Sequence, residues 1–286
     1  MFGVAVITGG AGGMGLATAK IVGRDSLVVL WDVSQERLDQ AKEELASSGI
    51  ASETFVCDIT DHHSVQALAA KARSLGPVVS VVHTAGVSPT MCSAEKIIRI
   101  NALGTISVND AFFDIAEPGM SVVNVASMAG HQAPRLLVPK RSYAQALTNP
   151  ERFMKRMLAL CRPLSEDAGS KLAYLLSKSF VIWYSSATAA KFGSKGARIV
   201  SVSPGSFDTA MGQAEVVSGS EAMTQFGALK RLGTPQEIAE VLAFCASSKP
   251  SYLTGVDILC DGGVMATMTR RDSLSMARSM AREKKK

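Results

Sequence analysis

The 286-residue sequence has few of the residues that mark covalent cross-links or metal sites. Its four histidines show no metal-ligand spacing, and its five cysteines are widely separated, with no Cys-x-x-Cys pair. An odd, scattered set of cysteines indicates neither a disulfide framework nor a zinc site. We therefore expect no bound metal and a reducing, cytoplasmic setting. The cysteines are Cys57, Cys92, Cys161, Cys245 and Cys260.

Long hydrophobic runs are also missing. No apolar stretch approaches the roughly 18 residues of a membrane-spanning helix, so we expect no integral membrane segment. The chain begins almost directly on the apolar run 2–8, without the pattern of a secretory signal. The composition is 47% hydrophobic and 19% charged, which is typical of a globular chain. No linker rich in Pro, Gly and Ser divides the chain, which favours one domain.

The net positive charge is concentrated in two segments where acidic residues are few. Residues 131–171 hold eight Lys and Arg against three Asp and Glu, and residues 267–286 hold seven against two. Because the whole chain has a net charge of +5, the remaining residues are acidic overall. This distribution argues against a uniformly basic nucleic-acid binder. We interpret residues 1–266 as the folded domain and 267–286 as a basic tail.

Apolar, β-branched runs alternate with amphipathic stretches along the chain. Continuous apolar runs are typical of strands that are covered on both faces, and strand–helix alternation indicates a doubly wound parallel sheet. The sequence therefore predicts an α/β fold, a single-domain Rossmann fold with a seven-stranded parallel sheet. The expected strands are 2–8, 26–31, 53–57, 78–83, 120–127, 197–203 and 255–260. The expected helices are 14–23, 34–48, 61–75, 93–116, 171–192 and 234–247.

One connection is much longer than the others. Residues 130–170 contain an additional predicted helix, 149–161, with Asn149 as N-cap and Pro150 at the first helical position. Its apolar stripe includes Phe153, Met157 and Cys161. A long connection in a compact domain is often a lid, and this helical insert could cover a substrate cleft. Alternatively, the stripe packs on the body of the protein or on a neighbouring subunit.

The glycine-rich run "VITGGAGGMG" at 6–15 follows the first expected strand and opens the first expected helix. Glycines permit a tight turn and a close approach to a pyrophosphate, which the helix N-terminus then attracts. Asp32 ends the second strand, near the spacing expected for a carboxylate that binds the adenosine ribose. With no Lys or Arg expected beside Gly12 or Asp32, we predict NAD over NADP. Asp32 could instead simply cap the following helix.

Tyr174 and Lys178 are four residues apart in a predicted helix and therefore lie on one face. Together with the spacing of Thr8, Gly9, Gly13 and Gly15, this pair resembles the short-chain dehydrogenase/reductase family over nearly the whole chain. In that family a nearby ammonium lowers the pKa of the tyrosine phenol, which transfers a proton while the nicotinamide carries the hydride. The resemblance implies the catalytic residues Asn101, Ser127, Tyr174 and Lys178. It implies a cofactor site made of Gly9, Gly12, Gly13, Met14, Gly15, Asp32, Val33, Asp58, Ile59, Ala85, Gly86, Tyr174, Lys178, Pro204, Gly205, Phe207 and Thr209.

The chain departs from the family pattern in two places. His83 and Thr84 stand where the family usually has two asparagines, which puts the hydrogen bonds of that turn in question. Ser127 and Tyr174 are separated by 47 positions, because the insert lies between them, whereas most members have about a dozen. A comparable insert is known in bacterial 3-alpha-hydroxysteroid dehydrogenase/carbonyl reductases, which this chain resembles in layout.

These residues favour an NAD-dependent oxidoreductase that interconverts a secondary alcohol and a ketone, with a bulky, steroid-like or alicyclic small-molecule substrate. The spacing of four between Tyr174 and Lys178 argues against the enoyl-reductase branch of the family. A 3-hydroxyacyl-CoA dehydrogenase or ketoacyl reductase is the alternative, because the basic insert could guide an acidic substrate. A non-catalytic NAD-sensing protein is a third possibility. The resemblance also implies a homo-oligomer, a tetramer or dimer built on the helices at 93–116 and 171–192.

Overall fold

A single parallel sheet forms the centre of the computed structural model, which describes residues 3–132, 138–216 and 223–269. Its seven strands follow the order β3-β2-β1-β4-β5-β6-β7. The order reverses between β1 and β4, which is the switch point of a doubly wound sheet. The predicted fold class and all seven strands are thereby confirmed. The strands are β1 Gly3–Thr8, β2 Ser26–Asp32, β3 Ser52–Val56, β4 Val78–His83, β5 Ser121–Val125, β6 Arg198–Pro204 and β7 Asp257–Cys260.

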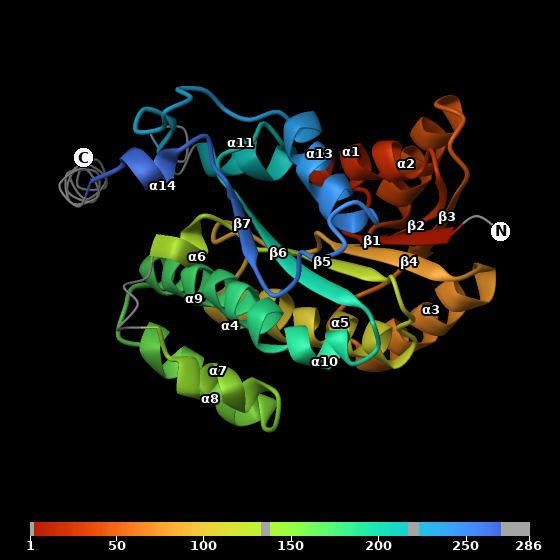
Figure 1. Cartoon of the computed structure of the whole chain (residues 1–286). Coiled ribbons are helices and arrows are strands. Elements are labelled where there is room, and N and C mark those ends of the chain that lie inside the picture. Colours follow the sequence, from red (N-terminus) through yellow and green to blue (C-terminus); the bar gives the residue numbers. More distant parts are fainter. Residues whose placement is uncertain (1–2, 133–137, 217–222, 270–286) are drawn as a thin grey trace.

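Helices cover both faces of the sheet (Figure 1). Three lie on one face: α1 Gly13–Val22, α2 Gln35–Ser47 and α13 Pro235–Ala246. The opposite face carries α3 His62–Leu75, α4 Ala94–Ile98, α5 Thr105–Asp114, α9 Glu166–Ala187 and α10 Ala189–Gly193. Three short helices, α6 Ala129–Gln132, α11 Ala210–Val216 and α14 Val264–Thr267, follow β5, β6 and β7. This two-sided cover explains why the strands are continuous apolar runs.

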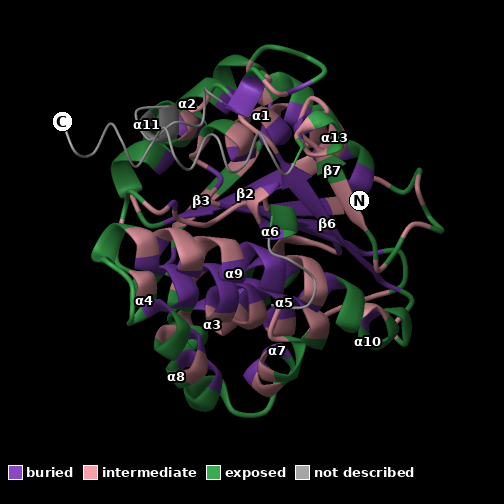
Figure 2. Ribbon diagram, turned by 90° about the vertical axis from the view of Figure 1, so that its left-hand side faces the viewer, coloured by how far each residue is buried: buried purple, intermediate pink, exposed green. Residues whose placement is uncertain are grey.

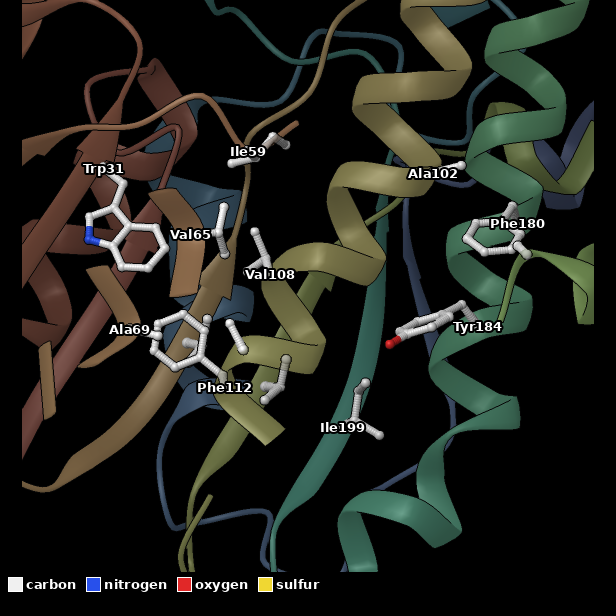
Figure 3. Packing of buried hydrophobic residues seen from close by; sticks show 14 of the residues in the cluster. Trp31, Ile59, Val65, Ala69, Ala102, Val108, Phe112, Phe180, Tyr184 and Ile199 are labelled. Carbon is white, nitrogen blue, oxygen red and sulfur yellow. The ribbon is translucent and has the colours of Figure 1, made fainter. Parts of the chain in front are cut away.

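The buried side chains gather along the sheet and the inner faces of its helices (Figure 2). Between β2 and α5, the rings of Trp31 and Phe112 lie 5.4 Å apart, and the same cluster extends through Val108 to Phe180 and Tyr184 of α9 (Figure 3). The burial of these apolar side chains fixes the helices against the sheet, so the loops at the carboxyl ends of the strands have a rigid base.

Two predicted helices differ from expectation. The segment 93–116 is not one helix, because a π-helix, η1 Arg99–Gly104, separates α4 from α5. The expected helix 171–192 begins earlier, at Glu166, and ends at Ala187. Glu166 and Asp167 in its first turn complement the positive end of the helix dipole, which favours the earlier start.

The insert forms an outer layer, visible at the bottom of Figures 1 and 2. Its helices α7 Lys140–Ala146 and α8 Pro150–Cys161 pack on α9, and α8 also contacts α4. Asn149 caps α8 as predicted, since its Oδ1 accepts a hydrogen bond from the N–H of Arg152 at 2.9 Å.

The apolar stripe of α8 is buried against the body of the protein. Phe153 is 1% exposed, and its ring lies 5.2 Å from that of Phe180 on α9. Tyr143 of α7 contacts the same ring at 5.3 Å and donates a hydrogen bond to the carbonyl of Leu176 at 2.9 Å. Of the alternatives left by the sequence, packing on the body therefore holds for the described helices. Residues 133–137 of the insert and 270–286 of the basic tail lie outside the described residues.

Candidate active site

The glycine-rich turn joins β1 to α1 at the carboxyl edge of the sheet. Gly9 has φ +64°, and a Cβ there would lie 2.8 Å from the Cα of Ala85, so only glycine fits. Gly12 is the N-cap of α1 and has no side chain with which to cap the first turn. The N–H groups of that turn can therefore donate hydrogen bonds to a phosphate.

Two other loops contact this turn. Ala85 and Gly86 follow β4, and Ala85 lies against Gly9. Thr209, which follows β6, lies 3.1 Å from the position that a Cβ on Gly13 would occupy. The structure thus brings together predicted cofactor residues from three strand ends, as expected for a nucleotide site at a topological switch point.

Asp32 ends β2 with its side chain only 6% exposed. Its Oδ1 accepts a hydrogen bond from the N–H of Ser34 at 3.3 Å. Ser34, not Asp32, is the N-cap of α2, because its hydroxyl oxygen accepts from the N–H of Arg37. The alternative in which Asp32 serves as the helix cap is therefore wrong.

Arg37 corrects the expectation that no Lys or Arg lies beside Gly12 or Asp32. Its Nη2 is 3.7 Å from Oδ2 of Asp32 and 3.6 Å from where a Cβ on Gly12 would be. The reason is helical geometry: Arg37 is the third residue of α2, and side chains lean toward the helix N-terminus. A cation therefore stands beside the carboxylate that was expected to exclude a 2′-phosphate.

The other predicted cofactor residues vary in exposure. Val33 is 66% exposed beyond the end of β2, whereas Ile59 is 5% exposed and packs on Gly104. Asp58 accepts hydrogen bonds from the N–H and the hydroxyl of Thr60 at 2.9 and 2.8 Å. Met14 of α1 packs against the core. Their contacts with a cofactor stay predictions.

The loop after β6 is anchored at both ends. Pro204 is the last residue of β6, and the N–H of Gly205 donates to the carbonyl of Cys260 at 2.9 Å. Phe207 is 6% exposed, and its ring occupies the space beside Gly233. The aromatic side chain therefore fixes the loop, which leaves Thr209 beside the glycine-rich turn.

His83 and Thr84, which depart from the family pattern, make hydrogen bonds of their own at this turn. His83 is buried, with Nδ1 2.6 Å from the hydroxyl of Thr8 and Nε2 3.1 Å from that of Thr105. Thr84 donates to the carbonyl of Thr8 at 2.7 Å. Burial, with the charge of Lys178 as a second cause, lowers the pKa of His83 to about 3. The neutral His83 side chain thus connects β1, β4 and the first residue of α5.

Asn101 lies in the π-helix and is 2% exposed. Its side chain pairs with the backbone of Val87, accepting from the N–H and donating to the carbonyl, both at 2.9 Å. Its Nδ2 is also 3.2 Å from the hydroxyl of Ser177, which donates to the carbonyl of Tyr174. Asn101 therefore links the loop after β4 to the helix that carries Tyr174. π-Helical turns occur often at functional sites.

Lys178 and Tyr174 lie on the inner face of α9. The Lys178 ammonium donates to the carbonyl of Val125 at 3.0 Å and lies 5.8 Å from the centre of the Tyr174 ring. The ammonium and Oδ1 of Asn101 both border Gly86, since they lie 3.4 and 3.2 Å from the position that a Cβ on Gly86 would occupy. The structure thus brings Lys178, Tyr174 and Asn101 together.

Ser127 is two residues beyond Val125, at the end of β5. Its hydroxyl oxygen accepts a hydrogen bond from the N–H of Ala129 at 3.2 Å, and the residue is partly exposed. Because the carbonyl of Val125 binds Lys178, the serine enters the same region from the strand side. The 47-residue gap in sequence does not separate it from α9, since the insert leaves from α6 and returns outside α9.

Sequence reasoning did not identify Arg37 or Ser177 as members of the site. Arg37 follows the predicted residue Val33 by four positions, and Ser177 directly precedes the predicted residue Lys178. Closeness in sequence to a predicted site residue was the available signal. Among the described residues, no three His, Cys, Asp or Glu side chains are arranged to hold a metal. In the same part of the chain, no helix is long and apolar enough to span a membrane.

Comparisons with known proteins agree with this arrangement. The family profile described as short chain dehydrogenase matches residues 3–139, and one described as Enoyl-(Acyl carrier protein) reductase matches residues 165–265. A short-chain dehydrogenase/reductase, bsc3, of Alternaria brassicicola is 34% identical over 92% of this chain and 96% of its own. The chain belongs to the short-chain dehydrogenase/reductase family. This is a family of oxidoreductases that use nicotinamide cofactors.

More distant relatives share the fold over a similar length. Galactitol 2-dehydrogenase (L-tagatose-forming) of Cereibacter sphaeroides is 27% identical over 91% of this chain and 93% of its own. The crystal structure of levodione reductase superposes with a TM-score of 0.74 at 24% identity, covering 94% of this chain and 99% of that one. Residues 140–164 fall between the two matched family segments. The helices α7 and α8 lie within this unmatched stretch.

Proposed function

We propose that the protein is an NAD(H)-dependent oxidoreductase that interconverts a secondary alcohol and a ketone. The observation that carries the proposal is that Tyr174, Lys178 and Asn101 gather beside the loop after β4, which itself contacts the glycine-rich turn. Bound nicotinamide would supply or accept the hydride. The remaining chemistry is a proton transfer to or from the substrate oxygen, which a positioned phenol can perform.

Each catalytic residue has a distinct role in this proposal. Tyr174 exchanges the proton, and Lys178 favours the phenolate through its charge and binds the nicotinamide ribose. Ser127 donates a hydrogen bond to the substrate oxygen and stabilises the negative charge that develops there. Asn101 holds a water molecule that connects Lys178 to solvent. Its side-chain bonds to Val87 and Ser177 support this role, because they fix its backbone in the π-helix.

We infer a preference for NAD from Asp32. A nearly buried carboxylate at the end of β2 can accept hydrogen bonds from the 2′- and 3′-hydroxyls of the adenosine ribose. It repels a 2′-phosphate. Arg37 opposes that repulsion, so the preference is smaller than Asp32 alone would produce. The five free cysteines fit the reducing, cytoplasmic setting that we propose.

A bulky apolar substrate is the substrate class that we propose. Met128, next to Ser127, packs with Met223 and Val264 in a cluster that Met265 and Met268 extend. Methionine side chains adapt to irregular apolar shapes, so this cluster suits a steroid-like or alicyclic ring system.

The positive charge of the insert favours the second candidate, a 3-hydroxyacyl-CoA dehydrogenase or ketoacyl reductase. A cavity of about 350 Å³ beside the insert is lined by Arg162 but also by Glu95 and Glu166, so its wall carries no net positive charge. The attraction of an anionic substrate therefore rests on the exposed cations of α8, Arg152 and Lys155.

The experiment is a turnover screen of the purified full chain. Steroid ketones, alicyclic ketones and acyl-CoA thioesters are each tested with NADH and with NADPH, and cofactor absorbance is followed. Turnover of a ring ketone supports the first candidate, and turnover confined to acyl-CoA thioesters supports the second. Cofactor binding without turnover on any compound would support the NAD-sensing alternative and contradict the proposal.

We also propose that the protein is a homo-oligomer. The insert covers part of the outer face of α4 and α9, on which a tetramer interface was expected. Exposed apolar side chains instead lie along the sheet edge at β7 and on the neighbouring helix α13, namely Leu259, Val256 and Phe244. An edge of this kind favours a dimer built on β7 and α13. Light scattering after size exclusion measures the mass directly.

A further inference from the structure

A second polar cluster lies behind Ser127 and is not used by the proposed chemistry. Nε2 of His131 is 2.8 Å from Oδ2 of Asp257, and the side chain of Asp257 is only 9% exposed. Oδ1 of the same carboxylate accepts hydrogen bonds from the hydroxyls of Ser201 at 2.5 Å and Ser203 at 2.9 Å. The cluster therefore joins α6 to β6 and β7 through one buried carboxylate.

The cluster is not a nucleophilic triad. Ser203 is fully buried, and its hydroxyl lies 3.3 Å from the same Nε2 that binds Asp257. A serine triad needs the carboxylate and the serine on opposite nitrogens of the imidazole. The arrangement is instead a bracket, in which the three donors Ser201, Ser203 and His131 converge on Asp257.

The bracket ends on the segment that carries Ser127. The N–H of Met128 donates to the carbonyl of Pro204 at 2.8 Å, and the N–H of His131 donates to the carbonyl of Met128 at 3.0 Å. A Cβ on Gly130 would lie 2.8 Å from the backbone carbon of Lys178, so this residue is wedged against α9. The short helix α6 thus lies between the strand end that carries Ser127 and the helix that carries Lys178 (Figure 1).

We propose that His131 is a positioning residue for Ser127. Its hydrogen bond to Asp257 holds the far end of the segment 127–131, while the bond from Met128 to Pro204 holds the near end. Loss of the imidazole leaves the nearly buried carboxylate one donor short and releases the far end of the segment. A hydrogen bond to a charged group changes an opening equilibrium by about 10- to 100-fold, which sets the expected effect.

The first test measures amide hydrogen exchange in the full chain by mass spectrometry, without cofactor or substrate. In His131→Ala, we expect the peptide covering 126–132 to exchange about 10- to 100-fold faster, with α3 unchanged. His131→Gln, which keeps a donor near the position of Nε2, restores most of the protection. His63→Ala, at an exposed histidine of α3, is the matched control and leaves 126–132 unchanged. Unchanged exchange at 126–132 in His131→Ala overturns the proposal.

Asp257→Asn keeps the size of the side chain and guards against a variant that does not fold. We expect it to loosen the same peptide, and protection equal to that of the wild type would count against the bracket.

The catalytic consequence rests on the proposed function. With the ring ketone that the wild type reduces fastest, His131→Ala lowers kcat about 10- to 100-fold with little change in KM, and His131→Gln recovers it. An unchanged kcat would refute positioning, whereas absence of turnover in the wild type would refute the proposed function and leave the exchange result standing.

Discussion

Cofactor selection by Asp32 and Arg37 gives the sharpest prediction of binding. Two unit charges about 4 Å apart interact by about 4 kcal/mol at an effective dielectric constant of about 20. Asp32 alone would therefore disfavour a 2′-phosphate by about three powers of ten in dissociation constant. The Arg37 guanidinium lies 3.7 Å from that carboxylate, but its side chain is 52% exposed, so solvent screens it. If it offsets about half of the repulsion, the wild type prefers NADH by about 10- to 100-fold.

The assay is a fluorescence titration of the purified chain with NADH and with NADPH. Arg37→Gln should weaken NADPH about tenfold or more and leave NADH within about a factor of three, because only the 2′-phosphate needs the cation. Asp32→Asn should remove most of the preference for NADH. Lys42→Gln is the matched control, since Lys42 is an exposed cation of the same helix and pairs with Glu53 at 3.6 Å.

Two results would refute this reasoning. If Arg37→Gln weakened both cofactors by the same factor, the guanidinium would contact the part that they share and not the 2′-phosphate. If the wild type bound NADPH more tightly than NADH, Asp32 would not act as the selecting carboxylate. Both outcomes are read from the titrations of the wild type and the three variants with each cofactor.

Three further predictions concern stability and the insert. Burial lowers the pKa of His83 to about 3, so below pH 6.5 the unfolded chain takes up a proton that the folded chain excludes. The unfolding free energy, measured in urea, should therefore fall as the pH drops from about 6.5 toward 3, by up to about 1.4 kcal/mol per pH unit. The His83→Gln variant should lose this dependence on pH. Phe153→Ala should lower the unfolding free energy by about 3–5 kcal/mol without changing NADH affinity, because Phe153 packs on α9; a large change in affinity would contradict an outer packing layer. Asn101→Ala should cost about 1–3 kcal/mol in the same urea assay, since it leaves the backbone of Val87 without partners, and an unchanged midpoint would contradict that pairing.

Much of the fold follows from local pattern. The seven apolar runs became strands of one parallel sheet, because hydrophobic periodicity and strand–helix alternation are properties of the sequence itself. Asn149 and Pro150 marked the start of α8 correctly, because capping depends on neighbouring residues. The capping role of Asp32 could not be resolved in this way, since Ser34 is an equally good cap two residues later.

Other features depend on contacts between distant segments. The π-helix at Arg99–Gly104 accompanies the bonds from Asn101 to Val87 and Ser177, which no local pattern encodes. The place of the insert depends on the fit of Phe153 and Tyr143 to Phe180, and an amphipathic helix alone does not show which surface it covers. The approach of Arg37 to the glycine-rich turn likewise required the relative positions of α1 and α2.

The most direct test of the central claim compares the wild type with Tyr174→Phe. The substrate is the ketone on which the wild type is most active, and NADH titration shows that the cofactor site is intact. We expect turnover to fall by about 10²- to 10⁴-fold while the affinity for NADH stays within about a factor of three, because only the proton-transferring hydroxyl is lost. Undiminished turnover by Tyr174→Phe would contradict the account.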